Sequence, residues 1–443
     1  MLGERQLAKF RCQWFWAVLA ASCAGASAAA PTIVITNLPP YGSSNYLGGV
    51  VLNASPAACK VAVFIDVPDY GWVTKPTCAQ PLTPIQPDGS WTTAIATGGS
   101  DQLATRIAAL LVSTNYSQPC VLGSNSVPTN VFAQALASAV ITRAYPGLRW
   151  VSFSGYDWWV KASDGLVGPG PNYFSDSTNN VWLDGQGQLH LRITNRSNQW
   201  QCVELISART FGYGSYRFQL ASPADNINAN AVLGLFTWSD DPAYANREID
   251  IECSRWGNSA DTNNAQYVVQ PYNLDGHLAR LAVPAGQASS TLLFTWETNS
   301  VGFQSQRGSF SPNPSPANVI SNWTYGLAVP PTGDESVHLN LWLFNGAAPT
   351  DNAEVEVVIS SFQFVPLGAP QAASLTMPAP FSTSPFRFAL HGEFDRWYHI
   401  QASTDLFSWQ NLLTLPATNP VMDFADTSSA GLNRRFYRAV TLP

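Results

Sequence analysis

The sequence predicts an all-β protein whose main architecture is an antiparallel sandwich. Turn-forming residues are abundant, with 31 Gly and 32 Pro among 443 residues, and they separate short apolar segments rich in β-branched and aromatic side chains. Apolar residues make up 46% of the chain, which excludes wholesale disorder. The chain is also longer than the roughly 100 to 200 residues of one domain, so we expect several β domains.

Residues 1–30 have the features of a secretory signal peptide. Basic residues precede an apolar stretch that starts at Trp14, and the small-residue pattern Ala26 to Ala28 follows. A membrane anchor and a lipid attached at Cys23 are the alternatives. No later segment reaches about 18 apolar residues, so we expect no transmembrane span in the mature chain. The predicted location is secreted, either extracellular or periplasmic, with cell-surface attachment as an alternative.

The strand-like segments divide the rest of the chain into five consecutive parts. These are an N-terminal β-sandwich module (31–123), a connector (124–147), a large sandwich (148–365), a Pro- and Ala-rich linker (366–385) and a small C-terminal β module (386–443). The apolar segment 105–113 is either a strand or a short helix, because periodicity does not separate the two in brief apolar runs.

Charge and cysteine content limit the possible partners. The formal net charge is −7, so the basic surface that binds nucleic acid is missing and we expect no nucleic-acid partner. Loss of the signal peptide leaves Cys59, Cys78, Cys120, Cys202 and Cys253. The number is odd, so at least one thiol is unpaired, and one bridge among the first three is compatible with an oxidising compartment. No cysteine pair has zinc-site spacing.

The segment 248–252 carries the clearest chemical pattern. Glu248, Asp250 and Glu252 alternate with two isoleucines, so on a strand the carboxylates share one face. The two glutamate Cα atoms are then roughly 13 Å apart, and converging side chains bring their carboxyl groups to about 5 to 6 Å. Retaining glycosidases need about 5 to 5.5 Å. A calcium site, a solvated strand face and chance are the alternatives from these residues alone.

Surrounding motifs give this segment a family context. The segments TFGYGSYRFQL (210–220), GLFTW (234–238) and REIDIECSRWG (247–257) resemble glycoside hydrolase family 16, and AQYVVQPY (265–272) and LNLWLFNG (339–346) follow in the order of that family. The resemblance covers residues 148 to 365. It implies a concanavalin A-like β-jelly roll for this region, and the strand segments on either side add two smaller β domains.

The resemblance also implies roles for the three carboxyl groups. Glu248 would be the nucleophile, Asp250 its assistant and Glu252 the acid/base of an endo-acting, retaining β-glycan hydrolase. One residue separates Asp250 from Glu252, as in lichenases and xyloglucan-active members. This spacing favours mixed-linkage or β-1,4-linked glucans.

Seven further residues match substrate-binding positions of the family or share a strand face with them. They are Trp238, Trp342, Gln270, Phe236, Asn340, Glu204 and Tyr272. Core packing is the alternative for each aromatic residue. Ile206 and Tyr272 depart from the lichenase pattern, which expects Arg and Asn there. The sequence does not choose among four more cleft candidates, and His190 is interpreted as structural. The four are Trp158, Trp159, Trp182 and Asn172.

The resemblance implies a polysaccharide substrate and no cofactor in the chemistry. A structural calcium ion is compatible with it, although the sequence identifies no metal ligands, and we expect a monomer. A lectin-like binder or a transglycosylase on the same fold, and a cell-surface adhesin, are the rival functions. The roles of the N- and C-terminal modules stay open, as carbohydrate-binding modules, spacers or attachment devices.

Overall fold

The computed structural model confirms the predicted all-β fold. It describes residues 30–223, 225–367, 374–377, 386–391, 397–416, 421–429 and 434–441. The chain divides into two units, of which one is Ala29–Ala369 and the other includes Pro370–Pro443. The predicted signal peptide, with its lipid-attachment alternative at Cys23, lies outside the described residues except for Ala30, and so does most of the predicted linker.

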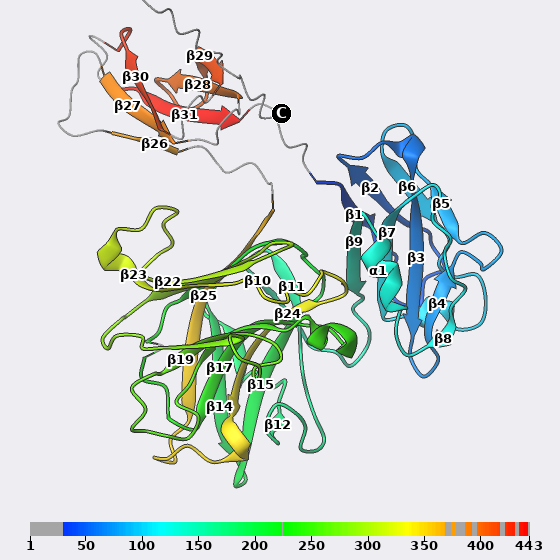
Figure 1. The fold of residues 1–443 in the computed structure, drawn as a ribbon, viewed down its shortest axis with the longest axis horizontal. Coiled ribbons are helices and arrows are strands. Elements are labelled where there is room, and N and C mark those ends of the chain that lie inside the picture. Colours follow the sequence, from blue (N-terminus) through cyan, green and yellow to red (C-terminus); the bar gives the residue numbers. More distant parts are fainter. Residues whose placement is uncertain are drawn as a thin grey trace, which may run out of the picture. The chain divides into compact units, whose positions relative to one another are not determined.

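The N-terminal module is a β-sandwich with a small helix on its outer face (Figure 1). Its elements are β1 (Thr32–Asn37), β2 (Leu47–Leu52), η1 (Pro56–Ala58), β3 (Cys59–Val67), β4 (Gly71–Lys75), β5 (Leu82–Pro84), β6 (Ser90–Thr93), η2 (Asp101–Leu103), β7 (Arg106–Ser113), β8 (Leu122–Ser124), α1 (Thr129–Gln134) and β9 (Ala137–Thr142). One sheet has the order β1-β2-β6, and the other has the order β8-β4-β3-β7-β9 with β5 beside β3.

Burial on both faces explains the continuous apolar sequences of β3 and β7. Val63 and Ile65 of β3 face the core between the two sheets, whereas Phe64 faces a second core that α1 covers with Phe132. A strand covered on both sides does not need to alternate polar and apolar residues. The segment 105–113 is therefore a strand, and its helical alternative is wrong.

The segment predicted as a connector contributes to the N-terminal module. It contains α1 and β9, and β9 pairs with β7 from Arg106 opposite Thr142 to Leu111 opposite Ala137. The buried guanidinium of Arg143 follows β9, and its Nε donates a hydrogen bond of 2.7 Å to the carbonyl oxygen of Ala104. The module thus continues through β9 before the chain enters the large sandwich.

The large sandwich is one extended, almost entirely antiparallel sheet that curls over a single core. Its elements are β10 (Trp150–Phe153), β11 (Tyr156–Val160), β12 (Tyr173–Phe174), β13 (Val181–Leu183), β14 (Leu189–Arg196), β15 (Gln199–Ser207), β16 (Gly214–Leu220), β17 (Ala231–Trp238), η3 (Pro242–Arg247), β18 (Ile249–Cys253), β19 (Ala265–Val269), β20 (Leu278–Leu281), β21 (Ser290–Trp296), β22 (Val301–Arg307), η4 (Pro316–Asn318), β23 (Val319–Tyr325), β24 (Ser336–Leu343), η5 (Phe344–Gly346) and β25 (Val355–Pro366).

The strand order of the large sandwich is β20-β19-β18-β17-β24-β15-β14-β25-β16-β21-β22-β23. Ile249 and Ile251 of β18 point into the core together with Phe294 and Trp296 of β21. Their burial places the intervening side chain of Asp250 on the opposite face of the sheet. Burial of this apolar face is the main force that fixes the register of β18.

Backbone hydrogen bonds join the N-terminal module to the large sandwich. The amide of Thr142 donates to the carbonyl oxygen of Ala208 at 2.6 Å, and the amide of Thr210 donates to that of Val140 at 3.0 Å. The Oγ of Ser138 donates to a carbonyl oxygen of the loop before β24 at 3.4 Å. The outer edge of β9 is therefore paired with the sandwich, which satisfies polar groups that a free strand edge would leave open.

The remaining strands belong to the C-terminal module. They are β26 (Ser374–Thr376), β27 (Phe386–His391), β28 (Trp397–Ser403), β29 (Gln410–Pro416), β30 (Val421–Asp426) and β31 (Phe436–Thr441). The sheets have the orders β26-β27-β30 and β29-β28-β31. Phe388, Leu390, Tyr398 and Ile400 form the core between these strands.

Cysteine pairing follows one of the combinations that the sequence leaves open. Cys78 and Cys120 form a disulfide in the N-terminal module, while Cys59, Cys202 and Cys253 are buried free thiols.

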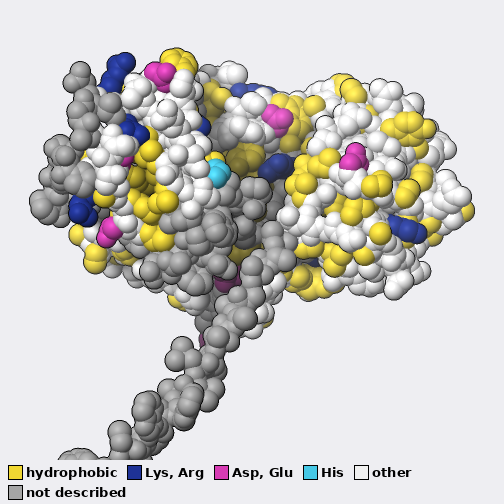
Figure 2. Space-filling view, turned by 90° about the horizontal axis from the view of Figure 1, so that it is seen from above, with side chains coloured by type: hydrophobic (Ala, Val, Ile, Leu, Met, Phe, Trp, Pro, Cys, Tyr) yellow, Lys and Arg dark blue, Asp and Glu magenta, His cyan; other side chains and the backbone are white. Residues whose placement is uncertain are grey.

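Charged side chains are few on the face of the molecule shown in Figure 2. No helix in the described part of the chain is long and apolar enough to cross a membrane.

Candidate active site

Strand pairing arranges the side chains on one face of β18, β17, β24 and β15 in rows across the sheet. We call this face the cleft floor. Gly234 of β17 lies opposite Glu252 of β18 on one side and opposite Asn340 of β24 on the other. Asn340 in turn lies opposite Glu204 of β15. Paired residues of antiparallel strands share a face, so these polar side chains form one row. A Cβ at Gly234 would stand 2.4 Å from the Asn340 Oδ1 atom, so a larger residue there would displace the Asn340 side chain.

A second row lies next to the first along the strands. Phe236 is opposite Asp250 and also opposite His338, and His338 is opposite Ile206. Glu248 directly precedes β18, beside the Trp238 end of β17. The alternation of β18 therefore brings its three carboxyl groups to the same surface, as the sequence predicts.

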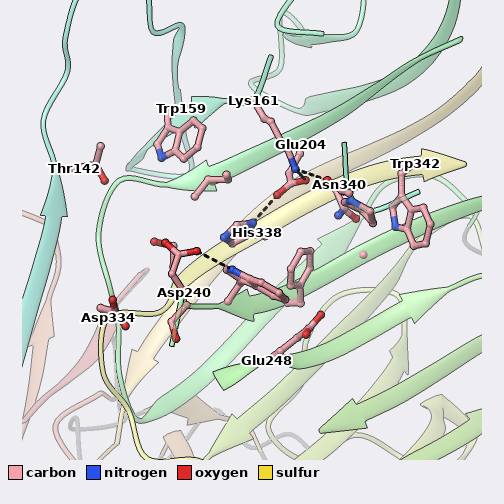
Figure 3. A pocket seen from close by; sticks show the side chains of 18 of the residues that line it. Thr142, Trp159, Lys161, Glu204, Asp240, Glu248, Asp334, His338, Asn340 and Trp342 are labelled. Carbon is pink, nitrogen blue, oxygen red and sulfur yellow. Dashed lines mark hydrogen bonds and ion pairs between the residues drawn. The ribbon is translucent and has the colours of Figure 1, made fainter. Parts of the chain in front are cut away.

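These rows line a cleft of about 700 Å³. Five of the seven predicted substrate-binding residues line it together with Glu248, Asp250 and Glu252. They are Glu204, Phe236, Trp238, Asn340 and Trp342. Figure 3 shows His338, Asn340 and Trp342 along β24, and Glu248 at the beginning of β18. The cleft volume lies in the range of small-ligand sites, about 300 to 1,000 Å³.

Burial and mutual repulsion raise the pKa values of the three carboxyl groups. Burial and the charge of Glu252 raise the pKa of Glu248 to about 8, against a lowering hydrogen bond from Asp250. Burial raises the pKa of Glu252 to about 7, and Gln266 and Arg280 limit the increase. Burial and the charges of both glutamates raise the pKa of Asp250 well above its usual value. The group therefore retains protons near neutral pH.

Specific partners orient two of these carboxyl groups. The Nε2 amide of Gln266 donates to the Oε2 atom of Glu252 at 2.7 Å, and Arg280 donates to the amide oxygen of Gln266 at 3.3 Å. Behind Asp250, the Nε2 amide of Gln270 donates to its Oδ2 atom at 3.3 Å. Gln266 lies opposite Glu252 in the strand register, which explains its place beside that carboxyl group.

Protonation of one carboxyl group changes the acidity of the next. The charge of Glu252 raises the pKa of Glu248, and this contribution vanishes when Glu252 holds a proton. Protonated Asp250 can also donate a hydrogen bond to ionised Glu248, which lowers the pKa of Glu248. The three carboxyl groups therefore titrate as one coupled set, in which the loss of a proton from one group changes the pKa of its neighbour.

Glu204 is buried in the cleft with two cationic or proton-carrying partners. Its Oε1 atom lies 2.7 Å from the Nδ1 atom of His338, and its Oε2 atom lies 3.0 Å from the Nζ atom of Lys161. Burial acts to raise the pKa of Glu204, but His338 and Lys161 hold it below its usual value. Glu204 is therefore an ionised hydrogen-bond acceptor with a fixed orientation.

The backbone just before Glu248 has an unusual conformation. Ala245, Asn246 and Arg247 have φ angles of 48°, 59° and 49°, which L-residues rarely adopt. The side chain of Arg247 is fully buried and forms an ion pair of 3.0 Å with Asp241. This loop fixes where β18 begins, and with it the position of Glu248.

Two predicted substrate-binding residues lie outside the cleft lining. Gln270 donates a hydrogen bond to Asp250, and Tyr272 is 64% exposed in the following turn. Strand β19 ends at Val269, so the alternation on which these predictions depended does not extend to either residue. Substrate binding by Tyr272 and Gln270 therefore stays a prediction, and Gln270 also donates a hydrogen bond to a carboxyl group of the row.

The four undecided cleft candidates occupy different environments in the structure. Trp159 lines the cleft, whereas Trp158 is fully buried in the core, as alternation along β11 requires. Trp182 stacks on His190 at 4.6 Å, and His190 also lies 2.7 Å from Glu356. The buried amide of Asn172 donates to the backbone carbonyl oxygen of Leu343. His190 is structural, as predicted.

Sequence analysis missed several groups that line the cleft. These are Lys161, Asp240, Asp334 and His338 of the large sandwich, and Thr105, Arg106, Thr142 and Tyr145 of the N-terminal module. Strand alternation could have identified His338, because it precedes Asn340 and Trp342 at two-residue spacing. Nothing in the sequence places the N-terminal residues at this cleft.

Calcium binding stays a prediction. The described residues contain no group of three or more His, Cys, Asp or Glu side chains arranged to hold a metal ion. Calcium also binds backbone carbonyl oxygens and water, so this observation does not identify or remove a site on the sandwich.

Comparisons with known proteins agree with the motifs. No protein-family model matches the chain. A β-glucanase of Bacillus subtilis (strain 168) is 28% identical over 179 residues, which are 39% of this chain and 71% of the relative. A β-glucanase of Bacillus licheniformis is 29% identical over 126 residues, and this chain spans about half of that relative, with 28% of its own residues and 49% of the other's.

Solved structures of similar proteins cover about half of this chain. The β-glucanase structure of Bacillus licheniformis has 19% identity and a TM-score of 0.37, with 50% of this chain and 99% of that chain covered. A prokaryotic β-1,3-1,4-glucanase (lichenase) from a mouse hindgut metagenome has 18% identity and a TM-score of 0.35, with 50% and 95% covered.

Proposed function

The chain is a relative of the bacterial β-glucanases, as its resemblance to glycoside hydrolase family 16 predicts, and on this premise we propose that it is a retaining, endo-acting β-glucan hydrolase. The observation that carries the proposal is the row of Glu248, Asp250 and Glu252. All three come from one strand segment and line one cleft. Paired carboxyl groups across a glycosidic bond are the usual apparatus of glycoside hydrolysis.

In the first step, ionised Glu248 attacks the anomeric carbon while Glu252 donates its proton to the leaving glycosidic oxygen. The bond between these two substrate atoms breaks, and an ester forms between Glu248 and the sugar. Asp250, protonated and buried, donates a hydrogen bond to Glu248 and limits the charge on the row. Its raised pKa supports this role.

In the second step, Glu252 accepts a proton from water as the water oxygen attacks the anomeric carbon. The ester bond to Glu248 breaks, the sugar leaves with its original configuration, and Glu252 is again protonated. A second sugar in place of water would give transglycosylation by the same route. Gln266 holds the Glu252 carboxyl group through a hydrogen bond of 2.7 Å in both steps.

The charge of the cleft favours a neutral polymer. Its lining has more carboxyl groups than cationic side chains. The carboxyl groups are Glu204, Asp240, Glu248, Asp250, Glu252 and Asp334, and the cations are Arg106 and Lys161. Sulfate or uronate groups would be repelled here. Together with the one-residue spacing between Asp250 and Glu252, this favours mixed-linkage or β-1,4-linked glucan.

Product release from several polymers tests the proposal. Purified residues 31–443 would be incubated with mixed-linkage glucan, xyloglucan, laminarin, agarose and sulfated carrageenan, and reducing ends would be measured. We expect cleavage of a neutral β-glucan and none of carrageenan. Proton NMR of the first products should show the β-anomer, and an initial α-anomer would contradict retention. Binding of glucan without any cleavage would favour the lectin-like alternative.

We further propose that the protein is secreted and acts as a monomer. The predicted signal peptide and the Cys78–Cys120 disulfide support an oxidising compartment. N-terminal sequencing of the mature protein from the culture medium would test cleavage after residue 30. Light scattering of the same material would test the oligomeric state.

A further inference from the structure

One end of the cleft is formed by the N-terminal module. Thr105 and Arg106 at the start of β7, Thr142 at the end of β9, and Tyr145 beyond it line the same cleft as Glu248. We call these four residues the module wall. Figure 3 shows Thr142 on the opposite side of the cleft view from Trp342.

The register of the floor places the module wall near the Glu248 end. Arg106 lies 3.6 Å from Asp240, two residues after Trp238, and 3.5 Å from Asp334, two residues before β24. Trp238 pairs with Ser336 at the beginning of β24, and Trp342 lies six residues farther, roughly 20 Å along the strand. The cleft thus extends from the module wall to Trp342.

The module wall is held in place from both sides. Arg143, between Thr142 and Tyr145, is buried and donates hydrogen bonds to carbonyl oxygens inside the N-terminal module. On the other side, the amide of Thr142 donates to the carbonyl oxygen of Ala208 in the large sandwich. A surface fixed in this way binds a ligand with little loss of conformational entropy.

The hydroxyl groups of the module wall are available to a ligand. Within the described residues, the side-chain oxygens of Thr105, Thr142 and Tyr145 make no hydrogen bond, and all three residues are half-buried at the cleft. The charge of Arg106 is balanced by Asp240 and Asp334. The surface therefore offers neutral hydrogen bonds and one aromatic ring, which match an uncharged sugar.

We propose that the module wall is a sugar-binding surface of the active site, which holds the part of a neutral β-glucan chain that extends beyond Glu248 toward the N-terminal module. This inference rests on the proposed function and assigns the module a part in substrate binding. Trp72 and Trp91 of the same module are buried, 2% and 1% exposed, so neither can stack on a sugar as part of an independent carbohydrate-binding module.

A matched pair of double variants tests the wall. Thr142→Val/Tyr145→Phe removes two wall hydroxyl groups with little change in shape. Thr92→Val/Tyr46→Phe removes the same groups from exposed positions of the same module. On mixed-linkage β-1,3-1,4-glucan we expect the wall variant to raise KM roughly tenfold, as the loss of two hydrogen bonds implies, with kcat reduced less than twofold. The control should stay within twofold in both.

Measurements of binding distinguish a failure of the wall proposal from a failure of the hydrolase proposal. Both double variants would be combined with Glu248→Gln, and their affinity for the same polymer would be measured by calorimetry. Weaker binding by the wall variant supports the wall even if no polymer is cleaved, in which case only the hydrolase proposal fails. Equal KM and equal affinity of the two double variants, or no binding of any neutral glucan, would overturn the wall proposal.

Discussion

The cleft floor and the module wall differ in how their polar groups are satisfied. On the floor, Asp250 and Glu204 are buried and each has specific partners, with Gln270 beside the first and His338 beside the second. On the wall, the Thr142 hydroxyl is half-buried and has no partner within the described residues. Buried charges need partners inside the protein, whereas half-buried hydroxyl groups can form their hydrogen bonds with a ligand. The floor is therefore suited to catalysis, and the wall is suited to binding the substrate.

The largest expected effect is on the floor, from Glu248→Gln. The amide keeps the shape of the side chain but cannot form the glycosyl ester, so we expect kcat/KM to fall by at least about 10⁴-fold. Initial rates on mixed-linkage glucan measure this loss. Glu297→Gln, at an exposed position after β21, is the matched control and should retain full activity. A Glu248→Gln enzyme within tenfold of the parent would exclude the nucleophile role.

A smaller effect is expected from Glu204→Gln, which keeps the shape of the side chain but removes the negative charge of its carboxylate. Hydrogen bonds to charged groups contribute about 1.5 to 3 kcal/mol, so KM should rise about 10- to 100-fold while kcat changes less. Glu354→Gln, whose side chain is 38% exposed beside Arg196, is the control. An unchanged KM would show that Glu204 only stabilises His338 and Lys161.

The contrast between floor and wall also explains what the sequence predicts. Alternation within one strand places Glu248, Asp250 and Glu252 together, because side-chain direction depends only on local geometry. The same rule does not extend to Tyr272, since β19 ends at Val269. Contacts between modules carry no local signal, so Thr142 could not be assigned to the cleft from its own surroundings in the sequence.

The Arg247 loop marks another limit of sequence analysis. Its left-handed backbone at three successive residues has no glycine to indicate it, and the sequence predicted β18 without the loop that positions it. The buried ion pair between Arg247 and Asp241 depends on tertiary packing. The fold class and the catalytic strand are therefore predictable, whereas the structures that position them are not.

The buried carboxyl row should make stability depend on pH, and Glu252→Gln tests this. The folded pKa of Glu252 is about 7, above the ordinary value of about 4.3. The folded state therefore keeps a proton that the unfolded state has lost, and stability decreases as pH rises from about 4 to 7. Glutamine removes this dependence. Between pH 4 and pH 8 we expect the free energy of unfolding of the variant to rise by about 3 to 4 kcal/mol relative to that of the parent.

Urea unfolding at several pH values measures this difference. Gln266 can still donate to the new amide oxygen, so the substitution preserves the contact with Gln266 seen at 2.7 Å. Glu354→Gln, at an exposed site, is the matched control for replacing a glutamate by glutamine. Equal pH dependence of the parent and Glu252→Gln would mean that the carboxyl row titrates normally, and the argument for a protonated acid at neutral pH would fail.

The smallest expected effect is on the wall, from Arg106→Gln. Its ion pairs with Asp240 and Asp334 are 3.6 and 3.5 Å long, and its side chain is 24% exposed, so we expect a loss of about 0.5 kcal/mol in unfolding free energy. Arg247→Gln is the matched comparison, because its fully buried guanidinium also pairs with Asp334 and its removal should cost about 3 kcal/mol or more. Urea midpoints compare the two variants. Equal losses of unfolding free energy would show that Arg106 stabilises the contact between the N-terminal module and the large sandwich. The wall would then have a structural role in addition to sugar binding.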